Sequence, residues 1–254
     1  MTQFSANLGF LWTELPLPDA IRAAAAAGFE AVECHWPYET PAEDVRMALH
    51  ETGLPMLALN TVRGDAGQNG LSALPDRQEQ AQHAIDQAIG YARRIGVSKI
   101  HVMAGIAQGA KAHDTFVANL RYACGAAVAH GITILIEPLN AHDAPGYFLN
   151  TLAQAANIIA EVERDNLKLM FDCYHVARTE GDVASHLQEY LPMIGHIQFA
   201  SVPERAQPDG GDLDYAEIFA LLDRLGWDQP LGAEYRPSRE TGVGLGWMQT
   251  LRAD

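Results

Sequence analysis

The chain has little cysteine and little positive charge, and each shortage excludes a class of protein. Its three cysteines, Cys34, Cys124 and Cys173, are odd in number and far apart, so no disulfide framework or thiolate metal site is indicated. This usage is typical of a reducing compartment, and we expect a cytoplasmic protein. Lys and Arg number 17 against 32 Asp and Glu, giving a net charge of -15. Because a phosphate backbone binds a basic surface, the sequence argues against nucleic acid as a partner.

Long hydrophobic runs are also absent. No apolar stretch of the sequence is long enough to cross a bilayer as a helix. The first five residues have neither the basic start nor the apolar segment of a signal peptide. We therefore expect no membrane partner.

What the sequence does contain is an alternation of strand and helix patterns, eight times over. With 254 residues, the chain has the length of one (β/α)8 TIM barrel, which is typically about 250 residues. No linker or low-complexity segment interrupts the pattern, so we expect a single domain over residues 1–254. The expected strands cover residues 4–10, 31–36, 55–60, 99–103, 132–137, 166–172, 194–200 and 231–234, and the expected helices cover 19–27, 41–51, 77–95, 114–130, 151–163, 182–190, 215–225 and 246–251.

Four successive strands end on or near a side chain with an oxygen ligand. Glu137 ends the buried run Ile132–Ile136, Asp172 ends the next strand, and Gln198 and Glu234 lie near the ends of the last two. One such Glu alone could equally be the partner of a structural Arg, because buried charges are usually paired. In a parallel barrel, however, these strand ends converge on one face. An all-oxygen set suits a hard divalent ion, so we predict a Mg²⁺ or Mn²⁺ site.

A long polar loop follows the third strand. Residues 61–76 include Arg63 and glycines at 64, 67 and 70. A loop of this length inside a compact domain is usually functional, and we predict a mobile lid over the barrel mouth. The alternative is a disordered insertion with no role.

Several motifs together resemble the hydroxypyruvate isomerase family of xylose isomerase-like TIM barrels. The resemblance covers essentially the whole chain and is carried by Glu137-Pro138-Leu139-Asn140, Asp172-Cys173-Tyr174-His175, His196-Ile197-Gln198 and Glu234-Tyr235-Arg236-Pro237. It implies a divalent metal held by Glu137, Asp172, Gln198 and Glu234, with the two glutamates also acting as catalytic acid/base groups. The implied reaction moves a proton between adjacent carbons through an enediolate, as in the conversion of hydroxypyruvate to tartronate semialdehyde or of a 2-oxo-tetronate.

Five further residues are candidates for substrate binding. The resemblance places His175 and, by position only, Asp143 at substrate oxygens; His175 could instead be a core histidine. An oxo-acid also needs a cation for its carboxylate, and arginine binds carboxylates best through its planar fork. Arg63, Arg205 and Arg236 follow strands that end at the mouth, although a lone Arg is more often solvated.

The exact substrate stays open in the sequence. His35-Trp36 stands where the family more often has Leu-Phe, and both side chains can reach the mouth. The alternatives are a ketose 3-epimerase, an endonuclease-IV-like DNA repair enzyme and a non-catalytic sugar-acid-binding barrel. The DNA enzyme would need several His ligands, but Gln198 and Ala104 stand at two of the expected His positions. A homo-oligomer is possible, and the sequence does not define it.

Overall fold

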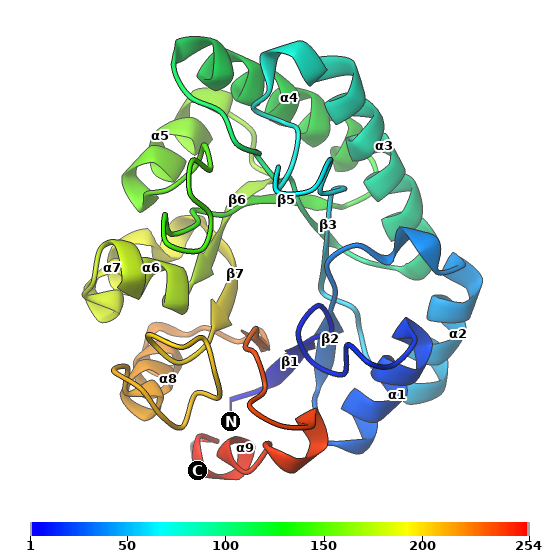
Figure 1. The fold of residues 1–254 in the computed structure, drawn as a ribbon, viewed down its shortest axis with the longest axis vertical. Coiled ribbons are helices and arrows are strands. Elements are labelled where there is room, and N and C mark those ends of the chain that lie inside the picture. The colour runs from blue at the N-terminus through cyan, green and yellow to red at the C-terminus, as the bar shows by residue number, and fades with distance from the viewer. Residues whose placement is uncertain (1, 253–254) are drawn as a thin grey trace.

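The computed structural model describes residues 2–252 as a ring of parallel strands enclosed by helices (Figure 1). The eight strands form one sheet in the order β2-β1-β8-β7-β6-β5-β4-β3, with every pairing parallel. Their bounds are β1 Phe4–Asn7, β2 Ala31–Glu33, β3 Ala58–Asn60, β4 Lys99–His101, β5 Thr133–Ile136, β6 Leu167–Asp172, β7 Ile194–Phe199 and β8 Leu231–Ala233.

The first and last strands of that order, β2 and β3, meet just before β3 begins. Val32 and Met56 form a parallel bridge, and the Leu57 N–H donates to the Val32 carbonyl at 2.8 Å. A second bond runs from the Cys34 N–H to the Ala58 carbonyl at 3.1 Å. These contacts join the two edge strands and close the sheet into a barrel. The expected TIM barrel is confirmed.

The helices lie outside the strands, as their apolar faces require. In α3, for example, Ala81, Ala84, Ile85, Ala88 and Ala92 are all buried along one face, the spacing of an amphipathic helix. The helices are α1 Leu17–Ala26, α2 Ala42–Thr52, α3 Gln78–Ile95, α4 Ala110–Val128, α5 Leu152–Val162, α6 Cys173–Thr179, α7 Val183–Tyr190, α8 Tyr215–Leu225 and α9 Trp247–Thr250. None of the helices in the described part of the chain is both long and apolar enough to span a bilayer.

An aromatic cluster packs the last helix, α9, against the first strand, β1. The Trp247 ring of α9 packs edge-on against Phe4 of β1, with ring centroids 5.0 Å apart, and lies 5.5 Å from Phe199 of β7. Buried aromatic pairs of this kind are worth roughly 0.5–1.5 kcal/mol beyond their buried area. The limits of the domain, expected at 1–254, stay a prediction, because residues 1, 253 and 254 lie outside the described residues.

Three sequence expectations differ from the structure. The first two strands end at Asn7 and Glu33, earlier than expected, because the chain then turns across the barrel mouth. A helix, α6, begins directly after Asp172, where only a loop was expected. The long loop after β3 is also partly fixed: Gly70 pairs with Ala104 in an antiparallel bridge.

Candidate active site

The carboxyl ends of the strands surround a cavity of about 340 Å³. Its lining combines aromatic side chains with carboxylates, imidazoles and three guanidinium groups. This is the face on which TIM barrels place their sites. Seven of the residues that the sequence singled out line it: Arg63, Glu137, Asp143, His175, Arg205, Glu234 and Arg236.

Glu137 projects from the end of β5, where Pro138 has no N–H to continue the ladder. Its carboxyl is buried, and Oε1 has no hydrogen-bond partner within residues 2–252. Oε2 lies 3.5 Å from His101 Nδ1. Burial, together with the negative charges of Glu234 and Asp172, raises the pKa of Glu137 well above its usual range.

Asp172 is the last residue of β6 and the N-cap of α6. Its Oδ1 accepts a hydrogen bond from the Tyr174 N–H at 2.8 Å, which fixes the carboxylate. Its Oδ2 has no hydrogen-bond partner among the described residues. Burial raises the pKa of Asp172 to about 7, although the nearby Arg205 acts in the opposite direction.

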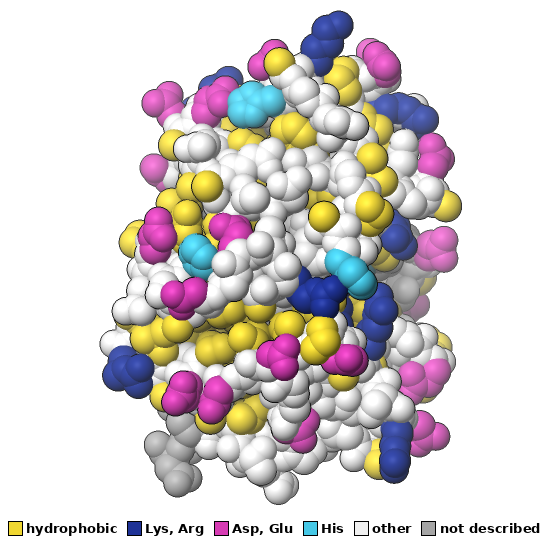
Figure 2. Space-filling view, turned by 60° about the vertical axis from the view of Figure 1, so that its left-hand side comes forward, with side chains coloured by type: hydrophobic (Ala, Val, Ile, Leu, Met, Phe, Trp, Pro, Cys, Tyr) yellow, Lys and Arg dark blue, Asp and Glu magenta, His cyan; other side chains and the backbone are white. Residues whose placement is uncertain are grey.

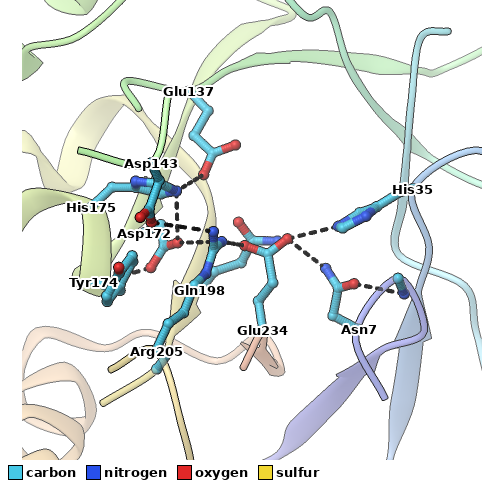
Figure 3. A network of polar contacts seen from close by, with 12 residues as sticks. Asn7, His35, Glu137, Asp143, Asp172, Tyr174, His175, Gln198, Arg205 and Glu234 are labelled. Atoms are coloured by element: carbon cyan, nitrogen blue, oxygen red, sulfur yellow. Dashed lines mark hydrogen bonds and ion pairs between the residues drawn. The ribbon is translucent and has the colours of Figure 1, made fainter. Parts of the chain in front are cut away.

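Glu234, directly after β8, is held by three donors. Arg205 Nη2 lies 2.5 Å from Oε2, and Asn7 Nδ2 and His35 Nε2 each lie 2.9 Å from Oε1 (Figure 3). Burial alone would raise the pKa of this carboxyl. The Arg205 charge and the hydrogen bond from His35 outweigh it and hold the pKa of Glu234 at about 2.

Gln198 lies on β7, paired in register with Asp172 of β6. Its Nε2 donates to Glu33 Oε1 at 2.8 Å. A carboxylate only accepts hydrogen bonds, so this contact assigns the amide: the NH₂ faces Glu33 and the oxygen faces away. That oxygen is buried and has no hydrogen-bond partner within residues 2–252.

The arrangement fits a divalent cation. Three of the four predicted ligands each present a buried oxygen that accepts no hydrogen bond from residues 2–252: Glu137 Oε1, Asp172 Oδ2 and Gln198 Oε1. Leaving such atoms unpaired costs about 1–3 kcal/mol each, and more for charged groups. The fourth, Glu234, is instead paired with Arg205, whose guanidinium also lies 3.5 Å from Asp172 Oδ2.

His175 stands beside these carboxylates but is placed as a donor. Within residues 2–252, one group of His, Cys, Asp or Glu side chains has ligand atoms within 4.8 Å of one another, and it contains Glu137, Asp172 and His175. However, His175 Nδ1 accepts from the backbone N–H of Asn140 at 3.1 Å, so a neutral ring carries its proton on Nε2. Burial lowers the pKa of His175 to about 3, which keeps it neutral. Nε2 lies 3.6 Å from Asp172 and is suited to donating a hydrogen bond.

The three candidate arginines occupy different positions. Arg205 is buried, bridges Glu234 and Asp172, and lies over the rings of Phe10 and Tyr174 at 4.7 and 5.0 Å. Arg63 and Arg236 are exposed at the cavity wall. Asp143, expected at a substrate oxygen, lies 3.9 Å from Arg205 Nη1.

The sequence reasoning did not single out several side chains that shape the site. Glu33 ends β2 and contacts Gln198, while Asn7, His101 and Asn140 each hydrogen-bond or lie next to a predicted site residue. Glu33 lies inside the expected strand at residues 31–36, so its place at the end of β2 became evident only in the structure. His35, which the sequence placed at the mouth, hydrogen-bonds Glu234. His35 packs so closely on Gly9 that a Cβ there would lie 2.2 Å from the His35 ring.

Comparison with known proteins gives the same family as the fold and the site. The xylose isomerase-like TIM barrel family matches residues 21–251 of this chain. This chain belongs to that family. The 2-oxo-tetronate isomerase of Cupriavidus necator is 46% identical over 98% of both chains, and the putative hydroxypyruvate isomerase of Homo sapiens is 40% identical over 98% of this chain and 94% of that one. The crystal structure of an AP endonuclease, family 2, from Brucella melitensis superposes with a TM-score of 0.95, 34% identity and full coverage of both chains.

These relatives confirm two expectations for this member of the xylose isomerase-like family. The resemblance to hydroxypyruvate isomerases is confirmed, and so is the prediction of an isomerase enzyme. The buried Glu137, Asp172 and His175 could hold a metal ion. The roles of the individual site residues, and the identity of the metal, stay predictions.

Proposed function

We propose that this chain is a metal-dependent isomerase of small hydroxy-oxo acids. The observation that carries the proposal is a set of three buried oxygens, on Glu137, Asp172 and Gln198, that accept no hydrogen bond from the described part of the chain. Mg²⁺ or Mn²⁺ would be held by these residues together with Glu234. When bound, the cation would hold adjacent substrate oxygens and stabilise the negative charge that develops on them.

The proton transfer is assigned to two glutamates in unlike surroundings. Glu137 and Glu234 reach into the same space from different strands (Figure 3). Arg205 and His35 lower the pKa of Glu234, which keeps it ionised and able to accept a proton but also makes it a weak base. Glu137 faces the same space from β5, so as the second carboxyl it can redeliver a proton to the neighbouring carbon. His175 Nε2–H is placed to donate a hydrogen bond to a substrate oxygen.

A carboxylate on the substrate is supported by two arginines on the cavity wall. Within residues 2–252, neither Arg63 nor Arg236 lies within 4 Å of a carboxylate oxygen, whereas Arg205 is held by Glu234. Two contacts hold Arg63. Its Nε donates to Asn69 Oδ1 at 2.8 Å, and its Cζ lies over the Trp36 ring, 5.3 Å from the ring centroid. Free guanidinium groups beside the reacting centre favour an oxo-acid over a neutral sugar. The relatives named for 2-oxo-tetronate and hydroxypyruvate support the same substrate class.

Two alternatives are less well supported. Solved D-allulose 3-epimerases share the fold, with a TM-score of 0.79 at 20% identity, which carries no inference about the substrate. A DNA substrate, suggested by the name AP endonuclease of the Brucella protein, requires a basic surface. The net charge is -15, and acidic and basic side chains are interspersed on the face shown in Figure 2.

Turnover of a substrate panel tests the proposal. The metal-stripped protein is assayed with and without added Mn²⁺ on hydroxypyruvate, a 2-oxo-tetronate and D-allulose. We expect Mn²⁺-dependent conversion of at least one of the two oxo-acids and little or none of the ketose. Turnover of the ketose alone would support the 3-epimerase, and no turnover of any compound would favour a non-catalytic sugar-acid-binding barrel.

A further inference from the structure

Four polar side chains, one of them the predicted metal ligand Gln198, form a buried cluster inside the barrel. They come from three strands, β1, β2 and β7, and each is at most 3% exposed. At their centre is a carboxylate on β2 that accepts hydrogen bonds from the other three. The four residues, which we call the Glu33 cluster, are Asn7, Glu33, His196 and Gln198.

The donors of this cluster are fixed by chemistry. Glu33 Oε1 accepts from Gln198 Nε2 at 2.8 Å and from Asn7 Nδ2 at 2.9 Å, while Oε2 accepts from His196 Nε2. The Asn7 amide is assigned independently, because its Oδ1 accepts from the Gly9 N–H at 2.9 Å. With both amide NH₂ groups facing Glu33, the Gln198 oxygen points away from Glu33 and has no hydrogen-bond partner within residues 2–252.

The neighbouring strand leaves room for this contact. Gly232 of β8 lies between β1 and β7 in the sheet. A Cβ at Gly232 would lie 2.8 Å from Glu33 Oε1 and 2.8 Å from Gln198 Cγ, closer than real Cβ contacts. The absence of a side chain at this position therefore lets Glu33 and Gln198 meet across the barrel interior.

We propose that Glu33 is a positioning residue, which holds the Gln198 amide so that its oxygen, not its NH₂, faces the metal. An unanchored amide could present either group, and an NH₂ group repels a cation. The same carboxylate also holds Asn7, whose Nδ2 donates to Glu234 Oε1 at 2.9 Å, so two of the four predicted ligands depend on it. This inference rests on the metal centre of the proposed function.

Mn²⁺ affinity of the substrate-free protein tests the role of Glu33. The dissociation constant is measured by electron paramagnetic resonance of free Mn²⁺ for wild type and for Glu33→Gln. Loss of a residue that orients a ligand typically weakens metal binding by about 10- to 100-fold, and we expect a change in this range. Glu30→Gln is the matched control, because Glu30 precedes the same strand at the opposite end of the barrel, where it accepts from the Phe4 N–H at 2.9 Å.

A swap variant separates orientation from general damage. Glu33→Gln combined with Gln198→Glu keeps one charge and one hydrogen bond in the pair, with donor and acceptor exchanged. We expect this double variant to bind Mn²⁺ more tightly than Glu33→Gln, because a carboxylate oxygen at position 198 is available to the site, but not to reach wild type, because the new NH₂ at position 33 opposes Asn7 Nδ2. An affinity of the double variant no better than that of Glu33→Gln overturns the proposal. If Glu33→Gln does not fold, Gln198→Glu alone is compared with the double variant, and equal affinities overturn it.

Two further outcomes distinguish a failure of this inference from a failure of the proposed function. Unchanged Mn²⁺ affinity in Glu33→Gln, with only a lower melting temperature, assigns Glu33 a purely structural role and overturns the inference while the proposed function stands. Failure of the wild-type protein to bind Mn²⁺ would overturn the metal centre of the proposed function, and this inference with it.

Discussion

At the scale of single residues, the charges around the cavity divide into two groups. The buried Arg205 is committed to Glu234 and Asp172, while the exposed Arg63 and Arg236 have no acidic partner within residues 2–252. The first kind neutralises the site itself, and the second kind is available to an anionic ligand. This division decides which arginine a substrate experiment should change.

Replacing Arg63 should weaken binding of acids selectively. A hydrogen bond to a charged group is worth about 1.5–3 kcal/mol, so Arg63→Ala should raise KM for an oxo-acid ~10- to 100-fold. KM for an uncharged ketose analogue should change little. Arg77→Ala is a matched control, because Arg77 ends the same loop, pairs with Asp65 and does not line the cavity. Equal kinetics of Arg63→Ala and wild type on the acid would contradict this role.

Metal binding should depend on pH in a defined direction. Burial raises the pKa of Asp172 to about 7, and burial and like charges raise the pKa of Glu137. Without a cation, Asp172 is partly protonated near neutral pH and Glu137 keeps its proton to a higher pH than an ordinary Glu, so binding has to displace protons. Mn²⁺ affinity should therefore fall as pH drops from 8 to 6, with proton release detectable by calorimetry in buffers of different ionisation enthalpy. Affinity independent of pH over this range would disprove the raised pKa values.

At the scale of elements, the loop after β3 is hydrogen-bonded at both ends. At its start, the Thr61 N–H donates to the His101 carbonyl at 2.9 Å, and further on the Gln68 carbonyl accepts from the Ile106 N–H at 3.1 Å. The Gly70 N–H donates to the Arg63 carbonyl at 2.7 Å, and the Ala73 N–H donates to the Ala104 carbonyl at 2.7 Å. A Cβ on Gly70 would lie 2.4 Å from the Met103 carbonyl oxygen, so this glycine serves close packing, where the sequence suggested flexibility. The lid at residues 61–76 stays a prediction, and these contacts confine the segment that could close to residues 64–67.

Hydrogen exchange tests the narrowed lid. Amides in residues 64–67 should exchange quickly in the free protein and slow down when a non-reactive oxo-acid analogue is added with Mn²⁺. The amides of Gly70 and Ala73 should be protected in both states, because they are already bonded, and so they serve as internal controls. If the analogue leaves residues 64–67 unchanged, the segment is a surface loop without a closing function.

Most helices and strands could be predicted from the sequence, because the spacing of apolar residues distinguishes a helix from a strand. Apolar runs with a terminal carboxylate located β5 and β6, and the parallel topology placed their ends on one face. The Glu33 cluster could not be predicted in this way, since it joins β2 to β7 across the interior and depends on Gly232 of a third strand. Likewise, α6 is too short to show a helical spacing of apolar residues. Asp172, which caps its N-terminus, is predicted from the sequence only as a metal ligand.

At the scale of the whole molecule, a cation at the barrel mouth should stabilise the fold. Ligand at 100 times its dissociation constant adds about 2.7 kcal/mol to the free energy of unfolding. For a chain of this size that corresponds to a rise in melting temperature on the order of 5–10 °C. We expect this rise when Mn²⁺ is added to protein that has been stripped of metal with a chelator, and differential scanning calorimetry measures it. The Asp172→Asn variant should show little or none of it, and an equal rise in that variant would place the cation elsewhere.

The central claim is that this chain moves a substrate proton through an enediolate, using Glu137 and Glu234. The most direct measurement is proton NMR of the reaction in heavy water with the Mn²⁺-loaded protein and an oxo-acid substrate. The account predicts solvent deuterium at the carbon that receives the proton, and a loss of about 10²- to 10⁴-fold in turnover for Glu137→Gln and Glu234→Gln with the fold intact. Product formed without solvent deuterium would contradict delivery of the proton by a second carboxyl that exchanges with solvent, and near-wild-type turnover of Glu234→Gln would contradict its role as the base.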